Sequence, residues 1–254
     1  MKLGFCCPPE KAAFAKASGC DYVELNFTAI ARQSEMAFAQ TAALLAEAGL
    51  RAEAMNCFIP GDFALQALTD PQPLEIFLRL GMARAKALGT RVIVFGSAAA
   101  RRLPAGKSKQ EGWGALCPVL RLAGALAGEN GLSLAIEPLR YAECNCVNTL
   151  REGLRLAALA GEANVFVLAD LYHMGENGED YADLLLAGNK LRHCHIGRPA
   201  GRYYPLPGDG YDYTPFFAAL RKIGYAARLS IEAAAPGGAE GLAESIAYLR
   251  ELAH

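Results

Sequence analysis

The sequence lacks the features that would mark a membrane protein, a secreted protein or a nucleic-acid binder. No apolar run approaches the roughly 20 residues needed to cross a bilayer. The opening MKLGFCC has neither the apolar segment nor the cleavage site of a secretion signal. With 25 basic and 26 acidic side chains, no surplus of positive charge indicates a nucleic-acid surface. These absences predict a cytoplasmic protein whose partner is a small molecule rather than a membrane or a nucleic acid.

Cysteine is present but lacks the spacing of a structural zinc site. The eight cysteines are scattered, and the close pairs Cys6–Cys7 and Cys144–Cys146 do not combine into two matching ligand pairs. A chain of 254 residues can bury a large core without disulfide support. We therefore expect reduced thiols that serve mainly in packing. Whether Cys144 or Cys146 touches a functional site is left open, as is assembly into a homo-oligomer.

Short apolar runs alternate with helix-like stretches along the whole chain. The apolar runs predict eight strands, at residues 3–7, 21–27, 51–59, 91–97, 132–138, 164–170, 191–197 and 228–233. Amphipathic or Ala/Leu-rich stretches between them predict helices, notably at 34–50, 75–89, 148–161 and 213–224. Nearly continuous apolar strands are typical of parallel sheets covered on both faces. The pattern favours an α/β fold: a (β/α)8 TIM barrel forming a single domain over residues 1–254.

Two irregular segments interrupt this alternation. Residues 96–114, which include the only tryptophan, Trp113, follow the fourth predicted strand, and residues 197–213, rich in Gly, Pro and Tyr, follow the seventh. Segments that follow barrel strands lie at the C-terminal mouth, where barrel active sites are built. We expect both loops to border the site.

Four polar side chains stand at the ends of the last four predicted strands: Glu137, Asp170, His195 and Glu232. Taken alone, an aspartate there is commonly a helix cap and a histidine commonly structural. Side chains from adjacent barrel strands converge on the axis, however, and three converging carboxylates repel each other unless a cation joins them. The four residues together predict a metal site. His193 shares the strand face of His195, and it is either one layer deeper in the site or buried and hydrogen-bonded.

The motifs IEPLRYAE, LADLYHMGE, HCHIGRPAGRYYP and SIEA resemble those of the xylose isomerase-like TIM barrel superfamily, in particular its tagatose 3-epimerase and hydroxypyruvate isomerase branch. The resemblance covers nearly the whole chain. It implies one divalent metal, manganese, magnesium or cobalt with zinc as a further candidate, bound by the same four residues. It also implies that Glu143, His173 and Arg202 bind the substrate.

The predicted chemistry is proton transfer beside a carbonyl. Oxygen-rich coordination with one imidazole suits manganese or magnesium, and such an ion would polarise the carbonyl of an α-hydroxy carbonyl substrate. Glu137 and Glu232 are the predicted catalytic bases, exchanging the neighbouring proton through an enediolate. We therefore predict an isomerase or epimerase of a sugar or sugar phosphate, in carbohydrate metabolism.

Three other functions are weighed against this prediction. Loss of a β-hydroxyl from the enolate would make the protein a metal-dependent dehydratase of a dehydroshikimate- or inosose-like substrate. An apurinic-site endonuclease shares the superfamily, but it needs a histidine-rich three-metal centre, and this chain has four histidines in all. A barrel that only binds a sugar or a partner protein would not need to keep all four predicted ligands.

The chain departs from the sugar epimerases at two positions. It has Leu139 before Arg140 where many of them have asparagine before arginine, and Arg198 where relatives often have aspartate. Additional cations at the mouth favour a substrate with a carboxylate or phosphate over a neutral ketose. The alternative is that Arg140 or Arg198 turns outward and pairs with a surface acid.

Overall fold

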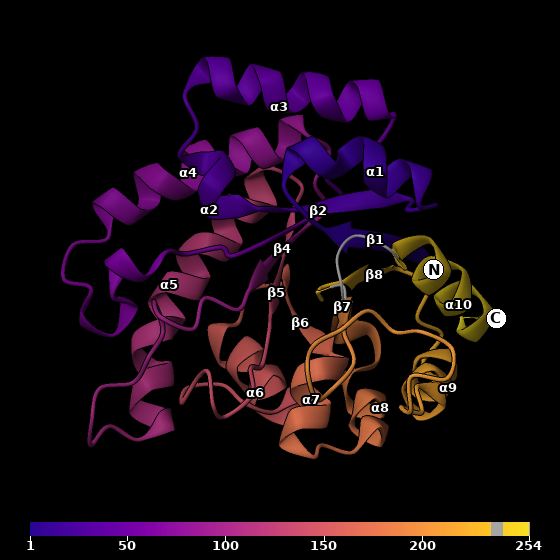
Figure 1. The fold of residues 1–254 in the computed structure, drawn as a ribbon. Helices are drawn as coiled ribbons and strands as arrows, with labels where there is room; N and C mark the ends of the chain where they lie inside the picture. Colours follow the sequence, from indigo (N-terminus) through magenta and orange to yellow (C-terminus); the bar gives the residue numbers. More distant parts are fainter. Residues whose placement is uncertain (235–240, 254) are drawn as a thin grey trace.

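A computed structural model describes residues 1–234 and 241–253, and it confirms the predicted TIM barrel (Figure 1). Eight parallel strands close into a ring in sequence order, and β8 returns to pair with β1. Their bounds are β1 Lys2–Cys6, β2 Tyr22–Asn26, β3 Ala54–Asn56, β4 Val92–Phe95, β5 Ser133–Ile136, β6 Val165–Asp170, β7 Leu191–Ile196 and β8 Arg228–Ile231. The ring places the ends of β5 to β8 next to one another, as the metal prediction requires.

Helices surround the ring (Figure 1). They are α1 Ala12–Ala17, α2 Phe27–Ala31, α3 Glu35–Ala48, α4 Gln72–Ala87, α5 Lys109–Glu129, α6 Leu150–Ala160, α7 Leu171–Asn177, α8 Leu184–Ala187, α9 Thr214–Lys222 and α10 Leu242–Leu252. Short 3₁₀ helices are η1 Pro9–Lys11, η2 Gly61–Phe63, η3 Leu65–Ala67, η4 Tyr181–Asp183 and η5 Gly188–Lys190. Local chemistry sets the helix ends: Ser34 caps the start of α3, and Gly49 ends it in the left-handed conformation.

The irregular segment after β4 is shorter than the sequence predicts. Trp113 was expected in the irregular segment after β4, but it lies inside α5, which begins at Lys109 behind a capping box between Ser108 and Glu111. Its indole is buried and donates a hydrogen bond of 3.0 Å to the carbonyl of Cys146. Trp113 therefore anchors a helix against a neighbouring loop and does not border the mouth cavity.

The barrel interior is filled by a small core separate from the one beneath the helices. Its apolar members are Tyr22, Ala54, Val92, Val94, Ala135 and Leu168. The ring of Tyr22 lies across Gly4, where a Cβ atom would come within 2.3 Å of the ring. Alternate residues of a strand face the same side, so the inward residue two positions after Ala135 is Glu137 and the one after Leu168 is Asp170. The filled interior thus forms a floor beneath the polar strand ends.

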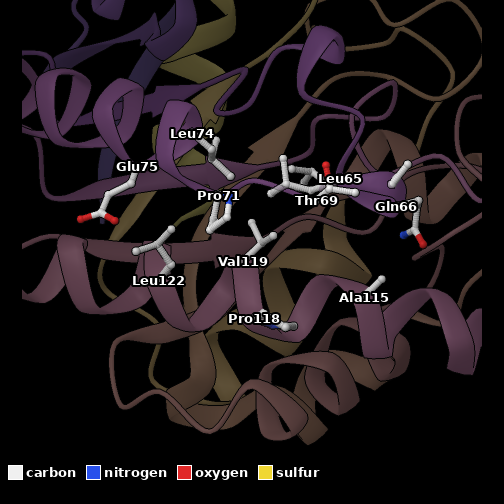
Figure 2. A pocket seen from close by; sticks show the side chains of 12 residues that line it. Leu65, Gln66, Thr69, Pro71, Leu74, Glu75, Ala115, Pro118, Val119 and Leu122 are labelled. Carbon is white, nitrogen blue, oxygen red and sulfur yellow. The ribbon is translucent and has the colours of Figure 1, made fainter.

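A cavity of about 720 Å³ lies outside the barrel (Figure 2). The start of α4 forms one side of it and the middle of α5 forms the other. Apolar side chains such as Leu74, Pro118 and Val119 dominate its wall, with Gln66, Thr69 and Glu75 as the polar exceptions. None of the predicted site residues lines this cavity.

Among the described residues, no helix combines the length and the apolar character that a membrane span needs.

Candidate active site

The four predicted metal ligands meet at the mouth of the barrel. Glu137, Asp170, His195 and Glu232 each offer one ligand atom, and these atoms all lie within 4.8 Å of one another. Nδ1 of His195 lies 3.0 Å from Oε1 of Glu137 and 3.1 Å from Oε2 of Glu232. A cavity of about 370 Å³ opens above them, and both glutamates line it. The geometry is that of a candidate metal centre at the base of an open pocket.

Asp170 serves two purposes at the end of β6. Its Oδ1 accepts a hydrogen bond of 2.8 Å from the backbone N–H of Tyr172 and so caps α7, the structural role considered for an isolated aspartate. Its Oδ2 faces the cluster, 3.4 Å from Nη2 of Arg202. The cap holds the carboxylate in one orientation and leaves its second oxygen available to bind a metal ion.

Positive charge offsets the cluster of carboxylates. Burial opposes ionisation of Glu232, but His195 and Arg202 outweigh it and hold the pKa of this carboxyl at about 2. For Glu137 burial dominates and raises the pKa, with the charge of Glu232 adding to the effect. Burial would lower the pKa of His195, but the surrounding carboxylates, Glu24 first, raise it well above its usual range. The site therefore favours a positive charge at its centre.

Arg202 reaches this centre from the loop after β7. Its Nη2 lies 2.5 Å from Oε2 of Glu232, its Nε donates to the carbonyl of the same residue, and its guanidinium stacks 4.6 Å from the ring of Tyr172. The backbone of Arg202 is left-handed, at φ +52°, a conformation that costs free energy for any residue except glycine. The tertiary contacts of the guanidinium hold the residue there.

Glu143 and His173, the other two residues implied to bind substrate, also line the mouth cavity. Nδ1 of His173 accepts a hydrogen bond of 3.2 Å from the backbone N–H of Arg140. In the neutral ring the other nitrogen, Nε2, then carries the hydrogen, and it lies 3.5 Å from Oδ2 of Asp170. His173 thus presents a donor to the cluster, and Glu143 presents an acceptor to the cavity.

The two additional arginines are engaged by protein groups. Arg140 forms ion pairs with Glu143 at 2.6 Å and Glu176 at 3.1 Å. Arg198 donates to the carbonyls of Asp209 and Ala200 and so holds together the loop after β7. Within the described chain, Arg202 is the one cation that lines the mouth cavity. The alternative of pairing with an acid therefore holds for Arg140, whereas Arg198 binds backbone carbonyls and no acidic side chain is among its described partners.

Two positioning side chains from the first half of the barrel were missed by the sequence analysis. The buried carboxylate of Glu24 in β2 contacts Nε2 of His195 at 2.9 Å, and Nδ2 of Asn56 at the end of β3 donates to Oε1 of Glu232 at 3.0 Å. A signal was available, because Glu24 and Asn56 are polar residues inside predicted strands. The metal-site prediction rested on polar residues at the ends of the last four strands, and both of these residues lie on earlier strands.

Gly96 and Arg101, after β4, support the backbone and side chain of Glu137. A Cβ atom at Gly96 would lie 2.2 Å from Oε2 of Glu137, so this position must stay without a side chain to leave room for the carboxylate. Arg101 is fully buried and donates to the carbonyls of Phe95 at 2.9 Å and Glu137 at 2.6 Å. It ties the ends of β4 and β5 together. Neither Cys144 nor Cys146 lines the mouth cavity.

A second group of potential ligands, Cys6, Glu24 and His195, shares the same imidazole. Burial raises the pKa of the Cys6 thiol well above its usual range, which disfavours the thiolate form that binds metals. Both oxygens of Glu24 already contact imidazole nitrogens. We therefore place the candidate metal centre at the first group, on the cavity side of His195.

Comparison with known proteins agrees with this architecture. The chain is 29% identical over 231 residues to L-ribulose 3-epimerase of Methylomonas sp. (strain DH-1), a match that covers 87% of this chain and 76% of the relative. A crystal structure of D-psicose 3-epimerase, determined in the presence of D-fructose, superposes with a TM-score of 0.85 at 19% identity, covering 100% of this chain and 99% of the other. D-allulose 3-epimerase from Methylomonas sp. in complex with D-allulose gives a TM-score of 0.81 at 22% identity, over 99% and 96%.

These two structures show a shared fold, while a family model matches the sequence itself. The family described as "Xylose isomerase-like TIM barrel" matches residues 12–252, nearly the full chain. The match agrees with the resemblance stated from the four motifs. The chain belongs to the xylose isomerase-like TIM barrel family.

Proposed function

We propose that the chain is a metal-dependent sugar epimerase or isomerase that moves a proton beside the carbonyl of a ketose through an enediolate. One observation carries the proposal: Glu137 and Glu232, from β5 and β8, both reach Nδ1 of His195 at the base of the cavity. Proton removal and return call for two positioned carboxylates. Relatives named L-ribulose, ketose and D-psicose 3-epimerase support epimerisation at C3.

The donor set fits a divalent cation. Three carboxylates and one imidazole suit manganese, magnesium or cobalt, and zinc also accepts such ligands. We propose Glu137, Asp170, His195 and Glu232 as the ligands, because their donor atoms already lie within 4.8 Å of one another. When bound, the ion would polarise the substrate carbonyl and stabilise negative charge on its oxygen.

Glu137 and Glu232 are the proposed catalytic bases. Their strands are separated by β6 and β7 in the ring, so the two carboxylates approach the cavity from different directions. One takes the proton on the carbon beside the carbonyl, and the other returns a proton to the opposite face. Return to the opposite face gives the epimer, and return to the neighbouring carbon gives the aldose or ketose isomer.

Glu143, His173 and Arg202 are proposed to hold the substrate hydroxyls. Glu143 supplies an acceptor, and His173 and Arg202 supply donors. The stacking of Arg202 on Tyr172 fixes the plane of the guanidinium, which restricts where a substrate oxygen can bind. Orientation of this kind lets a single carbon face the two bases.

We propose a substrate without a phosphate or carboxylate. Cationic side chains that are free to pair with a phosphate are its strongest hydrogen-bond donors. Arg140 and Arg198 are engaged by the protein, and Arg202, the remaining cation at the cavity wall, is engaged by Glu232 and Asp170. A neutral pentulose or hexulose fits this electrostatic environment better than a sugar phosphate does.

The direct test is proton NMR of D-fructose, D-psicose, D-tagatose and L-ribulose, each incubated in deuterium oxide with the manganese-loaded protein. We expect deuterium at C3 and a second ketose as product, both lost on addition of a chelator. Fructose 6-phosphate and hydroxypyruvate serve as charged comparisons and should exchange far more slowly. Loss of water from an inosose in place of exchange in any ketose would reject the proposal and support a dehydratase.

A further inference from the structure

One buried carboxylate joins the two histidines of β7 beneath the mouth. Oε1 of Glu24 lies 2.9 Å from Nε2 of His195, and Oε2 lies 2.8 Å from Nε2 of His193. All three side chains are almost completely shielded from solvent. A carboxylate between two imidazole nitrogens accepts hydrogen bonds, so each Nε2 atom is a donor. Glu24 thereby holds a hydrogen on Nε2 of both rings.

We propose that Glu24 is a positioning residue: it holds a hydrogen of His195 on Nε2, leaves Nδ1 as the nitrogen that faces the cluster, and so strengthens the binding of a divalent ion there. The inference rests on the proposed function, because it takes the four clustered residues as metal ligands. An imidazole binds a metal through a nitrogen that carries no hydrogen. With Nε2 donating to Glu24, the nitrogen left to bind an ion is Nδ1, which lies between Glu137 and Glu232 and gives up its own hydrogen when the ion binds.

The carboxylate is itself held by a chain of contacts that crosses the barrel. Nε2 of His193 also lies 3.3 Å from Oγ of Ser230 in β8, and this hydroxyl lies 2.8 Å from the hydroxyl of Tyr22 in β2. The chain therefore starts and ends on β2, at Tyr22 and Glu24. Because Glu24 has a partner on each oxygen, it cannot rotate without breaking a buried hydrogen bond.

The test compares the Mn²⁺ affinities of Glu24→Gln and of the control Thr90→Val, measured by the electron paramagnetic resonance signal of the free ion. Glutamine keeps the size of the side chain but replaces one acceptor with a donor, so one ring loses its partner. We expect the dissociation constant to rise about 10- to 100-fold, the usual effect of removing such a partner. Thr90→Val removes a buried hydroxyl that donates to the carbonyl of Ala52 before β4, outside this chain of contacts, and should change affinity by less than about threefold.

A second measurement needs no variant and holds even if Glu24→Gln does not fold. In ¹⁵N spectra of the wild-type protein loaded with Zn²⁺ as a diamagnetic probe, we expect His195 to carry its hydrogen on Nε2 and the ion on Nδ1. A hydrogen on Nδ1, or a folded Glu24→Gln with unchanged Mn²⁺ affinity, would overturn the inference. Neither measurement uses a sugar, so a protein that binds the ion as described but exchanges no ketose proton refutes the proposed function alone. A wild-type protein that binds no divalent ion would refute both.

Discussion

The two halves of the barrel contribute differently to the same site. The strands β5 to β8, shown in rose to yellow in Figure 1, carry all four proposed ligands at their ends. The strands β1 to β4, in indigo to magenta, carry none of these ligands. Three residues on or after them act on the ligands instead: Glu24 contacts His195, Asn56 donates to Glu232, and Gly96 leaves room for Glu137. The second half supplies the reactive groups and the first half decides their orientation. The predictions below test this division.

The largest expected effect comes from a ligand of the second half. Glu232→Gln removes a proposed base and an anionic ligand, while it keeps an oxygen that can accept from Asn56. We expect the deuterium exchange of a ketose substrate to fall by on the order of 10⁴-fold, the upper range for a positioned base. Glu244→Gln, on the exposed face of α10, is the matched control and should keep full activity. Retained exchange in Glu232→Gln would remove this residue from the catalytic role.

The second largest effect is expected from a substitution in the first half. In Gly96→Ala the new methyl group would overlap Oε2 of Glu137, and the flexible end of the glutamate side chain would move out of the site. We expect exchange to fall by about 10²-fold with little change in the melting temperature. Gly114→Ala in α5 is the control, since nothing lies within 4 Å of its added Cβ atom. It should keep activity and gain up to about 1 kcal/mol of stability. Equal activity of both variants would contradict the role of Gly96.

A smaller loss of activity is expected from Asn56, another residue of the first half that orients a ligand of the second half. Asn56→Ala removes the donor to Oε1 of Glu232 without removing any proposed ligand. Loss of one such hydrogen bond corresponds to about 1.4 kcal/mol, so kcat/KM should fall about tenfold. Steady-state kinetics at saturating Mn²⁺ measures this effect. A fall as deep as that of Glu232→Gln would mean that Asn56 contacts the substrate itself.

The smallest effect on activity is expected from a carboxylate of the second half that lies outside the site. Burial raises the pKa of Glu179, which accepts from the backbone N–H of Leu150, to about 7. The folded state thus keeps this proton where the unfolded chain releases it, and stability falls as pH rises from about 4.5 to 7. Glu179→Gln should remove this fall, raise stability at pH 8 by roughly 1 kcal/mol after solvent screening, and leave exchange unchanged. Urea unfolding of the wild type and of Glu179→Gln at pH 5 and pH 8 measures this stability difference. An equal change in stability between the two pH values for both proteins would contradict the raised pKa of Glu179.

The ligand cluster was predictable because it follows from a local pattern. Each of the four residues stands at the end of an apolar run, and a closed barrel brings consecutive strand ends together. Glu24 carried a weaker signal, since a glutamate inside an apolar strand needs a buried partner. The sequence could not name that partner, because His195 lies 171 positions away and reaches Glu24 only across the closed barrel.

The amino-acid sequence by itself determined the alternation of strand and helix, the closed barrel, and the side of the barrel on which the ligands gather. These features depend on hydrophobic period and on chain order, which are local properties. The tertiary structure decided which nitrogen of His195 faces the cluster, that Arg140 and Arg198 are engaged by protein groups, and that Gly96 leaves space for Glu137. Those outcomes depend on distances between segments far apart in the chain, and only packing sets such distances.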